Sequence, residues 1–102
     1  MTKKFKDGMR AIHPGEFLAE ILRELKITQS EFARTIGVAR MRISLILSGQ
    51  RPVSAEMALL IGKAFNQTPG YWMGLQADYD LKLAEKAVGA RLKKVQPVFA
   101  AA

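Results

Sequence analysis

The sequence predicts an all-α protein of five helices in a single domain, on three observations. Apolar residues recur at intervals of three and four in successive segments, the spacing of a helix that buries one face. Helix-start signals, either a polar capping residue or a proline, begin four of the five segments. The chain has no alternating strand pattern and no internal repeat, and its 102 residues are enough for one modest core.

Caps and apolar spacing place the first three helices. The first is expected to begin at Pro14–Gly15, because proline suits an early helical position. Its apolar stripe consists of Phe17, Leu18, Ile21, Leu22 and Leu25. Thr28 begins the second helix, and Glu31 three residues later completes a capping box. Gly37 then marks a tight turn, a position that is often left-handed and least costly for glycine. The third helix follows, and its buried face holds Ile43, Ile46 and Leu47.

The fourth and fifth helices complete the domain. Ser54 is expected to cap the fourth, and Thr68–Pro69 is expected to begin the fifth. The side chains with which the fourth helix closes the core are Met57, Leu60, Ile61, Ala64 and Phe65. The fifth can run as one helix to before Pro97, but its three internal glycines each weaken it by roughly 1 kcal/mol relative to alanine. A break in this helix therefore stays open.

Two apolar stripes run along the fifth helix, although a surface helix needs only one. The earlier stripe consists of Trp72, Leu75 and Tyr79. The later one consists of Leu81, Ala84, Val88 and Leu92, followed by Val95. The four preceding helices can cover only the first stripe. We therefore expect the second, at Leu81, Ala84, Val88 and Leu92, to form the seam of a homodimer.

The distribution of charge indicates a polyanionic partner. The net charge is +7 and the isoelectric point is about 10.1, which favours such partners through counterion release and also aids solubility. Residues 28–53 carry four arginines against the single acid Glu31. Arginine can grip guanine or a phosphate with two hydrogen bonds. A helix with arginines in its first turn, placed after a glycine turn, is the arrangement that reads the DNA major groove. An ordinary helical hairpin with solvated arginines is the alternative.

Composition also limits the other classes of function. Without cysteine, a disulfide or thiolate metal site is excluded, and one histidine, His13, allows no histidine pair. His13 is expected to fix the start of the first helix. We expect no enzyme, no metal and no cofactor, because no nucleophile–base set is present. No apolar segment approaches the roughly 20 residues that span a bilayer, so we expect a cytoplasmic protein with no membrane partner.

The segment from Thr28 to Arg51 resembles the Cro/repressor-type (XRE) helix-turn-helix. The residues that carry this resemblance are Gln29, Ala33, Gly37, Ile43 and Gly49. A wider stretch, from His13 to Leu83, resembles the HigA family of addiction-module antitoxins. Its motifs are HPGEFL at 13–18, SAEMAL at 54–59, TP at 68–69 and WMGLQADYDL at 72–81. The resemblance implies a five-helix, lambda-repressor-like helix-turn-helix domain with a longer C-terminal helix, over residues 13–96. Residues 1–12 are then a flexible basic segment and residues 97–102 a loose tail.

The HigA resemblance implies a double role. Such antitoxins bind double-stranded operator DNA as homodimers and repress their own operon, and they neutralise a HigB-like toxin, an mRNA-cleaving endoribonuclease. The positions that would read bases are Arg40, Met41, Ser44 and Leu45. Those that would contact phosphates are Gln29, Arg42, Ser48 and Arg51.

Three departures from the family pattern stand within this segment. Ala39 replaces the usual capping Ser or Thr of the third helix, Leu45 stands where a polar residue is common, and Ser48 where asparagine is common. Leu45 and Met41 could touch thymine methyl groups or pack against the protein. These departures leave open a protein-interaction module that no longer reads DNA. A free-standing repressor without a toxin is a second alternative.

Overall fold

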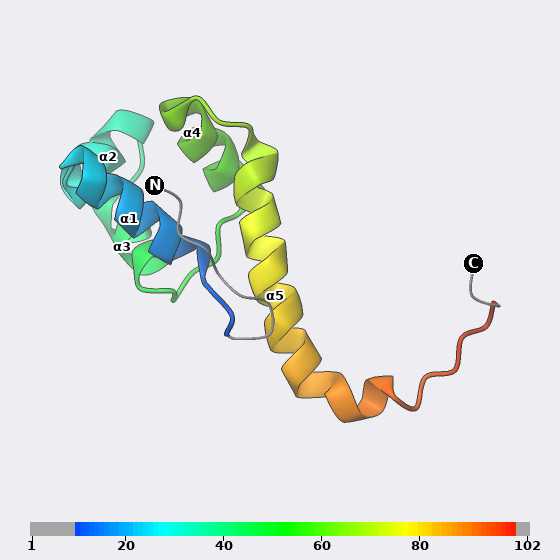
Figure 1. The fold of residues 1–102 in the computed structure, drawn as a ribbon. Coiled ribbons are helices and arrows are strands. Elements are labelled where there is room, and N and C mark those ends of the chain that lie inside the picture. The colour runs from blue at the N-terminus through cyan, green and yellow to red at the C-terminus, as the bar shows by residue number, and fades with distance from the viewer. Residues whose placement is uncertain (1–9, 100–102) are drawn as a thin grey trace.

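The computed structural model describes residues 10–99, which form five helices and no strand. The helices are α1 (Pro14–Leu25), α2 (Gln29–Ile36), α3 (Arg40–Leu47), α4 (Ala55–Phe65) and α5 (Pro69–Leu92). Helices α1 to α4 gather into one body, and the long α5 runs along its side and beyond it (Figure 1). The predicted all-α architecture of five helices with a longer last one is confirmed. Most of the predicted N-terminal segment 1–12, and part of the predicted tail 97–102, lie outside the described residues.

The helix starts follow the predicted caps, with one exception. The hydroxyl of Thr28 accepts the N–H of Glu31 at 3.1 Å, and the Glu31 carboxylate accepts the N–H of Thr28 at 2.8 Å, so the capping box is complete. Ser54 likewise accepts the N–H of Met57 at 3.2 Å. Thr68 occupies the N-cap position of α5 but makes no side-chain cap hydrogen bond. The prediction that Thr68–Pro69 begins this helix is confirmed, and Pro69 at its first position supplies the start signal without a side-chain cap.

One continuous core lies among all five helices. It consists of Leu18, Leu22, Phe32, Ala33, Ile43, Ile46, Val53, Met57, Ala58, Ile61 and Trp72. Phe65 covers its edge and stacks on Phe32 with ring centroids 5.1 Å apart. Two predicted core residues are exposed. Leu25 is 54% exposed, because it is the last residue of α1 and Lys26 turns the chain away in a left-handed conformation. Ala64 is exposed because it lies at the edge of the buried face of α4.

Helix α5 is unbroken from Pro69 to Leu92, so its internal glycines do not interrupt it. Its first three turns join the body: Trp72 is fully buried and donates from Nε1 to Gln67 Oε1 at 2.7 Å, and Gln76 is buried four residues later. The remainder projects away from the other helices (Figure 1). No helix in residues 10–99 has both the length and the apolar character that a membrane crossing requires.

The later apolar stripe of α5 faces away from the body. Leu81 follows Trp72 by nine positions. At about 100° per residue, this spacing places the two side chains on opposite sides of the helix. Leu81 and Leu92 are 60% and 53% exposed, and Ala84 is exposed as well, whereas Val88 is half-buried. The body of the chain therefore leaves this stripe largely uncovered.

Candidate DNA-binding surface

The turn between α2 and α3 sets the direction of α3. Gly37 ends α2 with φ = 77°, and its N–H and that of Val38 both donate to the carbonyl of Ala33, at 2.8 and 3.0 Å. No neighbour lies within 4 Å of where a Gly37 Cβ would be, so its backbone conformation, not lack of space, requires glycine. This closure satisfies the free carbonyls at the end of α2 and redirects the chain after two residues.

The turn leaves α3 with one buried and one open face. Ile43 and Ile46 point into the core and are almost fully buried. The predicted base-reading residues lie elsewhere around the helix: Arg40 and Met41 are exposed, Met41 by 65%, and Ser44 and Leu45 are half-buried. The first turn of α3 therefore presents an arginine and a methionine to solvent. Ala39 makes no side-chain cap, as its residue type predicts.

A well-bonded loop, residues 48–53, follows α3. The N–H groups of Gln50 and Arg51 both donate to the carbonyl of Leu45, at 2.9 and 3.1 Å. The Ser48 hydroxyl donates to the same carbonyl at 3.1 Å and accepts from Gln50 Nε2 at 3.0 Å. These bonds fold the loop back on the C-terminal end of α3, so Ser48 and Arg51 have fixed backbone positions beside it.

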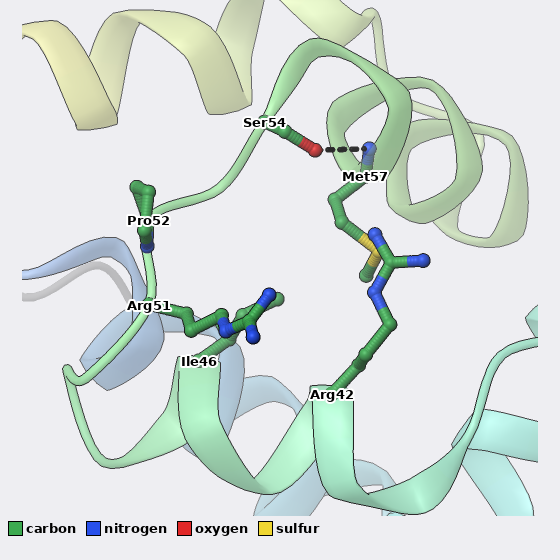
Figure 2. A pocket seen from close by; sticks show the side chains of 6 residues that line it. All are labelled: Arg42, Ile46, Arg51, Pro52, Ser54 and Met57. Carbon is green, nitrogen blue, oxygen red and sulfur yellow. Dashed lines mark hydrogen bonds between the residues drawn. The ribbon is translucent and has the colours of Figure 1, made fainter.

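Two of the predicted phosphate-binding arginines border one pocket of about 160 Å³ (Figure 2). Its other lining residues are Ile46, Pro52, Ser54 and Met57. Arg42 reaches into it from α3 and Arg51 from the loop (Figure 2). Arg42 Nη2 also lies 3.3 Å from Glu56 Oε1, in an ion pair with both side chains partly solvated. Such pairs contribute little to stability because water screens them, so Arg42 can exchange this carboxylate for another anion.

Gln29 stands apart from the other candidates, at the first position of α2. Its Oε1 atom is buried and has no hydrogen-bond partner within the protein. The first turn of α2 also carries Glu31, and hydrogen bonding to the backbone of Thr28 lowers the pKa of this carboxyl below its ordinary value. The structure thus gathers seven of the eight predicted DNA-contacting residues on α3 and the 48–53 loop, and places Gln29 on the neighbouring helix.

Three residues with a structural part in this surface were not predicted as site residues. His13, expected to fix the start of α1, does so by accepting the N–H of Gly15 at Nδ1, 2.8 Å away. Gln76 of α5 accepts the N–H of Val53 at 2.7 Å and donates to Asp80 at 3.0 Å. Glu56 pairs with Arg42 across two helices. Gln76 could have been found from the sequence, because it lies one helical turn after Trp72 and so shares its buried face. The bond of Gln76 to Val53 and the ion pair of Glu56 with Arg42 are tertiary contacts, whereas the His13 cap joins residues two apart.

Known proteins are similar to this chain in both sequence and fold. Residues 18–72 match the family described as Helix-turn-helix. Virulence-associated protein A′ of Dichelobacter nodosus is 43% identical over 70 residues, which are 68% of this chain and 61% of that protein. A solved addiction-module antidote protein of the HigA family from Coxiella burnetii is 42% identical, with a TM-score of 0.85 over 87% of this chain and 99% of that one.

A further solved structure is the Pseudomonas aeruginosa antitoxin HigA with the higBA promoter. It is 36% identical, with a TM-score of 0.83 over 88% of this chain and all of that one. Its likeness, like that of the Coxiella protein, extends along α5 as well as over the helix-turn-helix, because each match covers more than four-fifths of the chain. The chain therefore belongs to the helix-turn-helix family and, within it, to the HigA antitoxins.

Proposed function

We propose that this chain is the antitoxin of a HigBA-like toxin–antitoxin module and represses its own operon by binding operator DNA. The observation that carries the proposal is the exposed first turn of α3, with Arg40 and Met41 directly after the Gly37 turn, in a member of the HigA family. A solved HigA antitoxin in complex with its promoter supports the extension from family to DNA. The chain acts by binding, not by catalysis, and works in the cytoplasm.

In this proposal α3 enters the major groove. Its base-reading residues are Arg40, Met41, Ser44 and Leu45, with the two apolar side chains placed to meet thymine methyl groups. Phosphate contacts come from Gln29, Arg42, Ser48 and Arg51. The free amide oxygen of Gln29 cannot accept from a phosphate, so its NH₂ group makes that contact, and Arg42 leaves Glu56 to do the same.

We further propose that the chain is a homodimer joined through α5. The stripe Leu81, Ala84, Val88 and Leu92 lies on one helix face, and the body leaves it largely exposed. Two copies joined there can hold their α3 helices about 34 Å apart, the separation of successive major-groove faces on a palindromic operator. The same chain neutralises a HigB-like toxin by direct protein–protein contact.

A promoter-binding experiment tests the DNA-binding role. Purified protein is titrated into the DNA that precedes its own gene and into a scrambled duplex, over a series of salt concentrations. We expect specific binding, and we expect Arg40→Ala to weaken it by roughly 1–3 kcal/mol while leaving binding to the scrambled duplex unchanged. Arg23→Ala, on the exposed last turn of α1, is the matched control and should change neither. Equal affinity for both duplexes would overturn the proposal in favour of a module that no longer reads DNA.

Co-expression tests the antitoxin role. The chain is produced together with the small protein encoded beside it, and growth and co-purification are measured. We expect the neighbour alone to arrest growth, and the pair to co-purify and restore it. A neighbour that is harmless and does not bind would leave a free-standing repressor as the function.

A further inference from the structure

The buried side chain of His13 lies where three parts of the fold meet. It is only 6% exposed, and its Nδ1 accepts the N–H of Gly15 at the start of α1. Its ring packs edge-on against Tyr79 of α5, with centroids 4.9 Å apart. The 48–53 loop forms the third side: a Cβ on Gly49 would lie 3.7 Å from His13 Cγ, and the backbone of Arg51 lies close enough to the ring to favour its protonated form, which acts to raise the pKa. One imidazole thus contacts α1, α5 and the loop that follows α3.

The hydrogen bond from Gly15 defines which ring nitrogen carries the proton. Since Nδ1 accepts a backbone N–H, it carries no proton, and Nε2 must hold the proton of the neutral ring. Burial lowers the pKa of His13, against the opposing effects of the Arg51 backbone, Glu16 and Asp80. The neutral ring therefore acts as an acceptor toward α1 and leaves its Nε2–H as the group that can face the Arg51 backbone.

The loop held in this way carries a candidate phosphate contact. The side chain of Arg51 borders the pocket shared with Arg42 (Figure 2). A second tie, from Gln76 of α5 to the N–H of Val53, fixes the other end of the same loop. Both ties come from outside the helix-turn-helix, so the path of the loop is set by α1 and α5 as well as by α3.

We propose that His13 is a positioning residue for DNA binding, which acts by holding the 48–53 loop so that Arg51 reaches a DNA phosphate. The inference rests on the proposed function. It assigns to His13 no contact with DNA, because the ring is buried and its Nδ1 accepts a hydrogen bond within the protein. Its effect on affinity must therefore pass through Arg51.

Two isosteric variants separate this role from simple capping. In His13→Asn the amide oxygen can take the place of Nδ1 and cap α1, but the shorter side chain cannot reach the Arg51 backbone. In His13→Gln the amide nitrogen can take the place of Nε2 and reach the loop, but the cap on Gly15 is lost. Each variant thus keeps one of the two contacts, either the cap on Gly15 or the approach to the Arg51 backbone. Affinity is compared at a temperature where circular dichroism shows every variant folded.

The probe is the duplex that precedes the protein's own gene, titrated at several salt concentrations. We expect His13→Asn to weaken binding about tenfold, the size of one lost charged hydrogen bond at about 1.4 kcal/mol. The slope of log affinity against log salt should also fall by about 1 per protomer, as it does when one phosphate contact is lost. His13→Gln should bind within about twofold of wild type despite a melting temperature lowered by a few degrees.

A double-mutant cycle with Arg51→Ala decides the mechanism. If His13 acts through Arg51, His13→Asn has no further effect on affinity once Arg51 is alanine. Wild-type affinity in His13→Asn, or losses that multiply in the double variant, would overturn the inference while leaving the proposed function intact. Failure of the wild-type protein to bind this duplex in preference to a scrambled one would refute both.

Discussion

Replacing Gly15 by alanine is expected to destabilise the fold, although alanine is the better helix former. A Cβ on Gly15 would lie 2.0 Å from the carbonyl oxygen of Ile46, where 3.4 Å begins ordinary contact, so α1 and the end of α3 must separate by about 1.4 Å. Both sides of this contact are backbone, which cannot rotate away. Overpacking of this kind costs about 1–3 kcal/mol, and the propensity gain of up to about 1 kcal/mol offsets part of it. We expect a net loss of about 1–2 kcal/mol in the free energy of unfolding.

The chain holds a matched control for this substitution. Gly70 also follows a proline in the first turn of its helix, but a Cβ there would meet only Thr68 Oγ1, at 3.9 Å. Gly70→Ala should therefore raise the free energy of unfolding by about 0.5 kcal/mol. Urea unfolding followed by far-UV circular dichroism, at one protein concentration, measures both. A Gly15→Ala variant as stable as Gly70→Ala would refute the close approach of α1 to α3.

Three further predictions concern buried polar groups and the exposed stripe. Gln76→Met should lower the free energy of unfolding by about 1–3 kcal/mol, because the buried N–H of Val53 loses its acceptor; an unchanged urea midpoint would contradict this. Because burial lowers the pKa of His13 below its ordinary 6.5, the unfolded chain takes up the proton first, so stability present above pH 6.5 is lost as the pH falls. Melting curves between pH 7.5 and about 5 should show this loss in wild type and a smaller one in His13→Asn. Leu81→Asp with Leu92→Asp should convert the proposed dimer to a folded monomer in light scattering, and a persistent dimer would place the seam elsewhere.

The helices and most of their starts could be predicted because their signals are local. Thr28 with Glu31, and Ser54 before Met57, form hydrogen bonds within three residues, so a short stretch of sequence contains both partners. The turn at Gly37 is equally local, since its positive φ is a property of one residue. Thr68 shows where local signals end: the residue type permits a cap, but the side chain does not form it.

Features that depend on distant neighbours could not be predicted. The apolar spacing of α1 includes Leu25, yet only the path of the chain after Lys26 determines that this side chain is exposed. The clash that requires glycine at position 15 involves Ile46, thirty-one positions later. Periodicity assigns a residue to one face of a helix, but it does not say which element covers that face, or how far along.

The same division applies to the DNA-binding surface. The spacing around α3 predicts its buried Ile43 and Ile46, and it follows that Arg40 and Met41 face another side. The ion pair of Arg42 with Glu56 joins residues fourteen apart on two helices, and nothing in either segment alone points to it. The roles in DNA binding assigned to individual side chains stay predictions.

Because α5 is unbroken, the length of the helix between the body and the outer stripe also fixes the direction in which that stripe faces. Each residue advances a helix by 1.5 Å and turns it by about 100°. One alanine inserted after Asp80 would turn the outer stripe by more than a quarter turn while leaving the contacts of Trp72 and Gln76 with the body in place. In a dimer joined through that stripe, the number of residues in α5 between the body and the stripe would then set the spacing and tilt of the two α3 helices on a duplex. The spacing of half-sites that the dimer prefers can thus change through an insertion or deletion in α5, a segment that does not contact DNA bases.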